Sequence, residues 1–306
     1  MRAIINTPAG AGIATVDDPR PAPDEALVRV HAFSVNRGEL ALLKARTDHW
    51  RPGQDVAGVV VRAAADGSGP PAGTRVLALV EQGGWAEWIG VPTNRLGTVP
   101  DQVGLEQAAA LPLAGLTALR TLRLGGGLLG RRVLITGAGG AVGGMQVQLA
   151  IAAGARVTAV AAPGHREYLL ARGAEAVVED PSRAEGRYDL VADWVGGASL
   201  AAAIGTVTPG GTVVLGSGND AKTPINVYDF LGHEGARIVA YLSYAHPQPP
   251  GPDLTTLVQL VATGRLEPVI GMNRTWTELP EAIAALTERQ VRGKAVLTVD
   301  DPVRAR

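Results

Sequence analysis

The stretch that decides the fold is Val133-Leu-Ile-Thr-Gly-Ala-Gly-Gly-Ala-Val-Gly143, which reads as an apolar strand, a glycine-rich turn and a helix start. Gly137 permits a tight turn, Gly140 lets backbone N–H groups approach a diphosphate, and Gly143 allows close packing of helix on strand. The positive end of the helix faces the diphosphate. A turn that binds no ligand has the same letters, but the pattern that follows favours a dinucleotide site.

Downstream of this stretch, apolar strands alternate with helices. The expected strands are residues 133–136, 157–161, 176–178, 190–192, 212–215 and 237–242. Such alternation is typical of a parallel sheet with helices on both faces. The sequence therefore predicts an α/β protein with a Rossmann doubly wound parallel sheet as its cofactor domain.

The rest of the chain reads differently. Residues 1–116 are short strands between Gly and Pro turns, which favours a mostly antiparallel β domain. The Pro-rich segment His246–Pro252 marks a boundary, and a terminal strand, Lys294–Val299, is expected to return to the first domain. The predicted organisation is a β-rich domain over 1–116, a dinucleotide-binding domain over 117–246, and a return to the first domain over 247–306.

Composition excludes several classes of protein. The 306 residues carry 28 basic and 29 acidic side chains, a formal charge of −1, so neither nucleic acid nor an anionic membrane is an expected partner. The longest apolar stretch, Ala108–Leu119, contains Pro112 and Gly115 and is too short to span a bilayer. We expect a cytoplasmic protein. Cysteine is absent, which removes disulfides, thiolate nucleophiles and Cys-ligated zinc.

The end of the second expected strand indicates the type of cofactor. NAD enzymes usually place an Asp or Glu there against the ribose 2′-hydroxyl. This chain has Ala161-Ala-Pro-Gly-His-Arg166 instead, without a carboxylate. His165 and Arg166 can supply positive charge to a 2′-phosphate, so NADP(H) is the expected cofactor. The alternative is that Arg166 merely begins a solvated helix.

Further segments carry a family resemblance that runs nearly from end to end. They are Pro52–Val60, Gly84–Trp88, Ala108–Ala118, Ala138–Gly143, Gly173–Ala174, Asp193–Gly197, Gly210–Gly216 and Gly293–Leu297. Together they resemble the medium-chain dehydrogenase/reductase superfamily, and within it the zinc-free quinone oxidoreductase branch. The resemblance implies a GroES-like catalytic domain made from both chain ends, an active cleft where it meets the cofactor domain, and a homodimer through the sheet edge near Arg237–Leu242.

The resemblance also implies a set of cofactor-lining residues. They are Thr117; the turn residues Gly137, Ala138, Gly139, Gly140, Ala141, Val142 and Gly143; Ala161, Ala162, His165 and Arg166; Leu215, Gly216, Ser217 and Gly218; and Leu242. Asn36 is expected near the nicotinamide. Arg289 and Lys294 either reach the cofactor or belong to a salt-bridged or solvated face.

The chain departs from the zinc-dependent members of the superfamily. The loop Ser34–Glu39 has no Cys, Gly53-Gln54-Asp55 replaces a Gly-His-Glu, and the four-Cys lobe is missing. Gly232-His-Glu234 has the right letters but lies in the cofactor domain, so His233 is interpreted as a structural or surface residue. No metal site is expected.

Hydride addition to a conjugated acceptor suits these residues, because donors can hold the oxygen on which negative charge develops. The expected substrate is a quinone or an α,β-unsaturated carbonyl, with Asn36 orienting the cofactor or the carbonyl. Tyr241, Tyr244 or water is the candidate proton donor, and packing at a strand end or dimer edge is the alternative role for both tyrosines. Glu39 is either an acid or base, or an exposed helix-start carboxylate.

Three other functions stay open on the sequence alone. The first is a pathway-specific enoyl reductase that acts on one biosynthetic intermediate. The second is a non-catalytic NADPH-binding protein that senses, binds a partner or serves as structure. The third is a zinc alcohol dehydrogenase.

Overall fold

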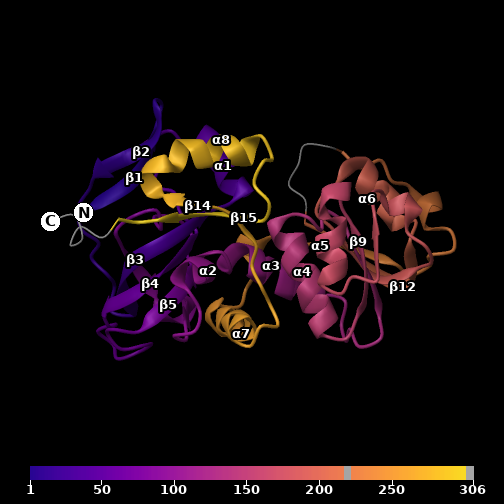
Figure 1. The fold of residues 1–306 in the computed structure, drawn as a ribbon, viewed down its shortest axis with the longest axis horizontal. Helices are drawn as coiled ribbons and strands as arrows, with labels where there is room; N and C mark the ends of the chain where they lie inside the picture. The colour runs from indigo at the N-terminus through magenta and orange to yellow at the C-terminus, as the bar shows by residue number, and fades with distance from the viewer. Residues whose placement is uncertain (217–221, 301–306) are drawn as a thin grey trace. The chain divides into compact units, whose positions relative to one another are not determined.

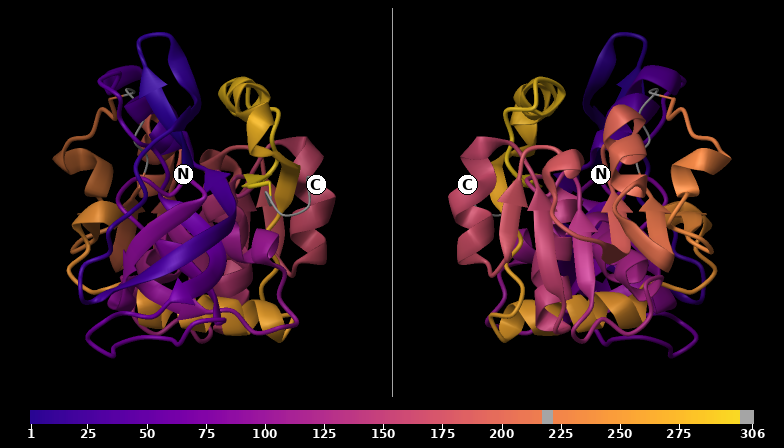
Figure 2. Two further views of the ribbon diagram at one scale, coloured as in Figure 1. Left: turned by 90° about the vertical axis from the view of Figure 1, so that its left-hand side faces the viewer. Right: turned by 90° about the vertical axis from the view of Figure 1, so that its right-hand side faces the viewer.

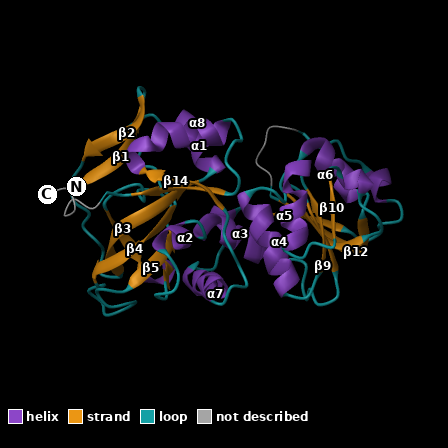
Figure 3. Ribbon diagram, in the orientation of Figure 1, coloured by secondary structure: helices purple, strands orange, loops and turns teal. Residues whose placement is uncertain are grey.

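The computed structural model describes residues 1–216 and 222–300, and Figure 1 draws its ribbon. The chain divides into two compact units. The β unit contains Met1–Leu116, His246–Gly264 and the chain from Pro268 onward, and the α/β unit contains Thr117–Ala245 with Arg265–Glu267. Strands dominate the β unit, whereas helices accompany the strands of the α/β unit (Figure 3).

The strands of the β unit form, within the described residues, a two-stranded sheet of β1 and β2 and a seven-stranded sheet. The larger sheet has the order β14-β15-β3-β4-β5-β7, and β6 also pairs with β3. The strand bounds are β1 Arg2–Thr7, β2 Gly10–Thr15, β3 Glu25–Val35, β4 Asp55–Arg62, β5 Arg75–Leu79, β6 Trp88–Pro92, β7 Leu96–Thr98, β14 Ile270–Thr275 and β15 Lys294–Thr298.

Along the sequence, the helices of this unit connect its strands. They are α1 Arg37–Ala45, α2 Leu105–Ala109, α7 Gly251–Ala262 and α8 Leu279–Thr287, with the short 3-10 helices η1 Thr93–Arg95 and η6 Trp276–Glu278. Helix α3, Pro112–Arg123, begins in the β unit and ends in the α/β unit.

Strand pairing brings distant parts of the chain to one end of the larger sheet. β15 runs antiparallel to β3, with Ala295 opposite Val35. On the other side of β3, Asp55 at the start of β4 lies opposite Ser34. The residues that follow β3 and precede β4 and β15 therefore meet at the same place.

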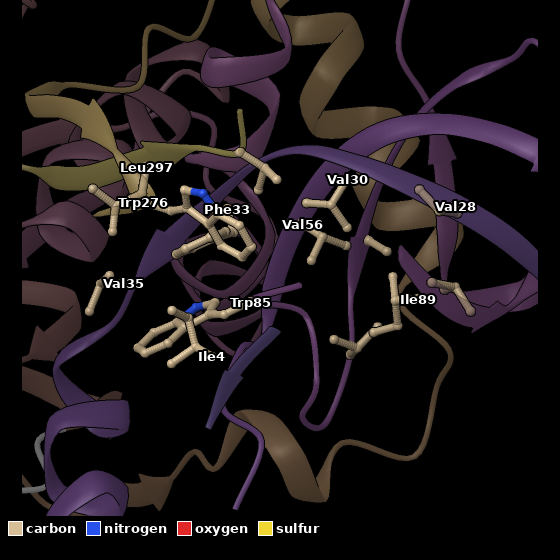
Figure 4. Close-up of a cluster of buried hydrophobic side chains, with 14 of the residues drawn as sticks. Ile4, Val28, Val30, Phe33, Val35, Val56, Trp85, Ile89, Trp276 and Leu297 are labelled. Atoms are coloured by element: carbon tan, nitrogen blue, oxygen red, sulfur yellow. The ribbon is translucent and has the colours of Figure 1, made fainter. Parts of the chain in front are cut away.

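Alternating apolar residues of these strands build the core of the β unit. Val28 and Val30 of β3 point inward at period two, as in any strand with one covered face. Figure 4 shows them in a cluster with Phe33, Trp85 and Trp276. The rings of Phe33 and Trp85 are stacked, with centroids 5.5 Å apart.

The α/β unit is built on a parallel sheet of six described strands in the order β10-β9-β8-β11-β12-β13, whose arrows are seen in the right-hand view of Figure 2. The strands are β8 Arg132–Ile135, β9 Arg156–Val160, β10 Ala176–Val178, β11 Tyr188–Asp193, β12 Val207–Leu215 and β13 Arg237–Ala240. The helices are α4 Ala141–Ala152, α5 Arg166–Ala171 and α6 Gly197–Ile204, with the 3-10 helices η2 Pro163–His165, η3 Pro181–Arg183, η4 Val227–Phe230 and η5 Ser243–Ala245.

The strand order of this sheet reverses between β8 and β11, which are neighbours although two strands separate them in the sequence. Ligands of such sheets bind outside the carboxyl ends of the strands at this reversal. The predicted α/β fold, a doubly wound parallel sheet with a mostly β domain, is confirmed.

Candidate functional site

The glycine turn joins β8 to α4 as the sequence predicts. Gly137 has a φ of 60°, the left-handed conformation that glycine adopts without strain. A Cβ on Gly143 would lie 2.5 Å from the carbonyl oxygen of Gly137, so helix and turn pack too closely for any side chain there. Gly140 is the N-cap of α4, whose first backbone N–H groups are available to an anion. The turn therefore fits the diphosphate of a dinucleotide.

The segment that follows β11 holds this turn in place. The Thr136 hydroxyl donates to Asp193 (2.8 Å) and accepts from the backbone N–H of Trp194 (3.0 Å). The other oxygen of Asp193 accepts from the N–H of Gly196 (2.6 Å). Burial raises the pKa of Asp193, and the bonds from Thr136 and Gly196 partly offset that rise. These bonds connect the ends of two neighbouring strands, β8 and β11.

The residues expected at the adenosine end follow β9. Ala161 is buried and Ala162 is exposed. The His165 ring covers Gly139, where a Cβ would come within 2.5 Å of its Cδ2 atom. Arg166 is exposed at the start of α5 and donates from one guanidinium nitrogen to the carbonyl of Val177 (2.6 Å). Its remaining donors can serve a phosphate.

The other predicted cofactor residues lie at several places. Thr117 is buried in α3, and Leu215 and Gly216 are half-buried at the end of β12. Leu242 is exposed just after β13. Ser217 and Gly218 fall outside the described residues. The carboxyl ends of β8, β9 and β12 thus bring the turn, the 161–166 segment and Leu215–Gly216 to one edge of the sheet.

The two tyrosines that were expected as proton donors differ in their surroundings. The Tyr241 backbone follows β13 and donates to the carbonyl of Leu215 (3.0 Å), and its side chain is half-buried. Tyr244 lies in η5 with 79% of its surface exposed. Arg289 is exposed after the end of α8.

In the β unit, Asn36 and Lys294 meet in a buried polar group that we call the Asn36 cluster: Ser34, Asn36, Glu39, Asp55 and Lys294. Lys294 donates to the amide oxygen of Asn36 and to Asp55 (3.0 Å). The amide nitrogen of Asn36 donates to Asp55 (2.9 Å) and to Glu39 (3.2 Å). Asn36 therefore connects both carboxylates and the ammonium group.

Asp55 is surrounded by donors. One oxygen accepts from Ser34 (2.7 Å), Asn36 and Lys294, and the other accepts from the backbone N–H of Leu113 (2.8 Å). Leu113 lies in the first turn of α3, where the helix dipole favours a negative charge. Asp55 is fully buried, and these contacts supply what a buried carboxylate needs.

Glu39 is fully buried, so the expectation of an exposed helix-start carboxylate is wrong. It accepts from the backbone N–H of Asn36 (2.8 Å) and of Gln54 (2.9 Å), and so ties the two ends of the 36–54 segment together. Burial, followed by the negative charge of Asp55, raises the pKa of Glu39 to about 8, although hydrogen bonds from Asn36 and the charge of Lys294 act the other way. The spacing of N-cap Asn36 and Glu39 indicates the helix start, but no local signal reveals the burial.

The donor set does not fit zinc. Within the described residues there is no group of three or more His, Cys, Asp or Glu side chains that could hold a metal ion. At the segment Gly53-Gln54-Asp55, the oxygens of Asp55 already accept from protein donors, one of them an ammonium group. His233 is buried in the α/β unit against Arg187 and the carbonyl of Val207, which agrees with a structural role.

Comparison with known proteins identifies the family. Residues 22–101 match the alcohol dehydrogenase GroES-like domain, and residues 166–297 match the family described as zinc-binding dehydrogenase. A probable zinc-binding oxidoreductase, mitochondrial, of Arthroderma benhamiae is 30% identical over 92% of this chain and 91% of its own length. The mouse NAD(P)H oxidoreductase RTN4IP1, mitochondrial, is 29% identical over 90% of this chain and 82% of its own length.

A solved structure supports the same assignment. The quinone oxidoreductase from Coxiella burnetii superposes with a TM-score of 0.84 at 25% identity, covering 98% of this chain and 99% of that one. The chain belongs to the medium-chain dehydrogenase/reductase superfamily, as its motifs predict. It is an oxidoreductase of that type, with a GroES-like domain, a Rossmann sheet and a nicotinamide cofactor. None of the described helices combines the length and the apolar composition that a membrane crossing needs.

The raised pKa of Glu39 predicts a pH-dependent stability. The pKa of Glu39 rises from 4.5 to about 8 on folding. The contribution of its protonated side chain to the free energy of unfolding is therefore complete below pH 4.5, falls as the pH rises, and is lost once the pH has passed through 8. We expect Glu39→Gln to remove up to about 5 kcal/mol of the fall in unfolding free energy between pH 5 and 9. Urea unfolding at each pH measures it. Glu281→Gln, an exposed glutamate in α8, is the control, and parallel curves for parent and E39Q would contradict the prediction.

The ion pair of Lys294 and Asp55 predicts strong coupling between the two residues. Lys294→Met leaves a buried carboxylate without its counter-ion, which costs about 3–5 kcal/mol of unfolding free energy. Adding Asp55→Asn removes that charge and should recover at least half of the loss. A double-mutant cycle by urea unfolding measures the coupling. Strictly additive losses would show that the two groups do not depend on each other.

Proposed function

We propose that this protein is an NADPH-dependent oxidoreductase that transfers hydride to a quinone or an α,β-unsaturated carbonyl without zinc. The observation that carries the proposal is the segment after β9, which lies at the same edge of the sheet as the glycine turn and presents His165 and Arg166 in place of an acid. The chain's similarity to an NAD(P)H oxidoreductase and to a quinone oxidoreductase supports the proposal.

NADPH supplies the hydride, and the chain's own residues hold it and its acceptor. The turn Gly137–Gly143 and the start of α4 bind the diphosphate, and Arg166 binds the 2′-phosphate. In the Asn36 cluster both N–H groups of the Asn36 amide are already donated, to Glu39 and Asp55. What this side chain retains for a ligand is a lone pair on its amide oxygen. We therefore assign Asn36 as an acceptor toward the nicotinamide amide rather than as a donor to the substrate carbonyl.

The proton that completes reduction of a conjugated acceptor comes, in this proposal, from a tyrosine or from water. Tyr244 is well exposed and can exchange protons with solvent, and Tyr241 is the second candidate. Measuring the turnover rate of Tyr244→Phe and Tyr241→Phe, and the solvent isotope effect on that rate, distinguishes these tyrosines from water as the proton donor.

Cofactor preference is the first test. We expect NADPH to bind more tightly than NADH, and Arg166→Ala to weaken NADPH about tenfold, the loss of one charge-assisted hydrogen bond, without affecting NADH. Isothermal titration calorimetry measures both. Arg156→Ala is the matched control, because Arg156 lies at the opposite end of β9 and pairs with Glu175. Equal affinities of the parent for the two coenzymes would overturn the assignment.

The acceptor is the second test. A panel of simple quinones and enones, followed by loss of NADPH absorbance, should include good substrates. If the protein reduces none of them, a pathway-specific enoyl reductase is favoured. If it binds NADPH tightly but no acceptor of any kind oxidises the bound cofactor, a non-catalytic binding protein is favoured. Stoichiometric zinc in the purified protein would restore the alcohol dehydrogenase alternative.

We further propose a homodimer through the edge of the parallel sheet. β13 is the last strand in the described sheet order, and large apolar side chains of the segments before and after it in the sequence are exposed: Ile225, Val227, Tyr228, Leu231, Leu242 and Tyr244. An uncovered strand edge with apolar flanks is a template for pairing with a second copy. The cytoplasmic location stays a prediction.

The dimer has a direct test. Leu231→Asp places a charge within this apolar group and should convert the dimer into a monomer, measured by sedimentation velocity. Leu129→Asp is the control, since Leu129 is 86% exposed in the same unit but is not part of the group near β13. A parent protein that sediments as a monomer contradicts the proposal.

A further inference from the structure

Trp194 occupies a position that the proposed function leaves unexplained. It follows β11 at the carboxyl edge of the parallel sheet, and its side chain is half-buried. A Cβ on Gly216, at the end of β12, would lie 2.0 Å from Cζ3 of its ring. A Cβ on Gly137, in the glycine turn after β8, would lie 3.3 Å from the Cβ of Trp194. This one residue therefore extends from the turn to the end of β12.

A chain of hydrogen bonds fixes the indole. Its Nε1 donates to the side-chain oxygen of Gln146 on α4 (2.7 Å), and Gln146 donates to the hydroxyl of Thr121 on α3 (3.0 Å). Thr121 in turn donates to the carbonyl of Thr117 (2.6 Å). Gln146 and Thr121 are fully buried, so the ring is anchored in the interior of the unit rather than at its surface. A half-exposed aromatic ring held this firmly is suited to contact a ligand.

The strand order indicates which half of a dinucleotide the Trp194 ring would contact. The sheet consists of two mononucleotide-binding halves that meet at the reversal between β8 and β11. The adenosine half belongs with β8 and β9, where the ribose 2′ position is recognised. Trp194 lies beyond the reversal, against the end of β12, and so on the other half.

We propose that the Trp194 indole forms a wall of the site for the nicotinamide–ribose half of the cofactor, an inference that rests on the proposed function. The ring lies over Gly216 on the side where a Cβ would project, so a ligand approaching from that side meets the indole and not the glycine backbone. A flat, rigid ring packs well against a nicotinamide ring or its ribose.

Two ligands separate this role from a general effect on the unit. NADPH contains both halves, whereas adenosine 2′,5′-bisphosphate contains the adenosine half alone. By calorimetry, Trp194→Ala should weaken NADPH about tenfold, as expected for a lost stacking contact, and leave the bisphosphate within about twofold. Trp194→Phe, which keeps an aromatic ring, should stay close to the parent for both. Trp88→Ala, in the β unit, is the control for loss of a half-buried tryptophan.

Three kinds of result would overturn the proposed role of Trp194 or the proposed function. Equal losses for both ligands mean that the residue acts through folding, and unchanged or tighter NADPH binding by W194A means that the indole is no wall but an obstruction; either result overturns the proposal. If the parent protein binds neither NADPH nor NADH, the proposed function itself fails. Tight NADPH binding by the parent with no effect of Trp194 removes this inference alone.

A second readout uses fluorescence. The other four of the five tryptophans, Trp50, Trp85, Trp88 and Trp276, belong to the β unit. The difference between the emission of the parent and of Trp194→Phe therefore reports on Trp194. NADPH should quench this difference signal and the bisphosphate should not, and a difference signal that NADPH leaves unchanged contradicts contact with the ring.

Discussion

The β unit depends on one buried ammonium group and the acceptors around it. Lys294 reaches Asp55 and Asn36 across 239 and 258 positions of the sequence, and a charge in such a place is stable only with partners on every side. Because side chains alternate between the faces of a strand, a slip of one residue between β15 and β3 would carry Lys294 to the other face. The cluster thus selects the register that also fills the apolar core around Phe33 and Trp85.

In the α/β unit, glycines rather than charges set the constraint. The close approach of Gly143 to Gly137 and the cover of Trp194 over Gly216 leave no room for side chains at these backbone positions. Thr136 and Asp193 connect the two segments that carry them. Turn, indole and carboxyl edge are therefore joined by direct contacts and hydrogen bonds.

How much the sequence predicts depends on how far apart the interacting residues are. The glycine turn and the alternation of strands and helices are local patterns, and they give the doubly wound sheet correctly. The β6 strand begins at Trp88, after a segment in which Ala86 pairs with Ala3 and Trp85 accepts from Ile4, so the chain just before β6 bonds to β1. The burial of Glu39 and Lys294 comes from strands paired across most of the chain, and the anchoring of Trp194 comes from Gln146, 48 positions away. Neither leaves a local signature.

The pairing of β15 with β3 also bears on the order in which the chain assembles. The described strands of the parallel sheet lie between residues 132 and 240, so that sheet can form from one continuous segment during synthesis. β3, by contrast, pairs over Glu25–Arg29 with β6, but its Ala32–Val35 end has an open edge until residues 294–298 have been made. Until then this apolar strand end is exposed to other nascent chains, and this interval is the period in which aggregation competes with folding.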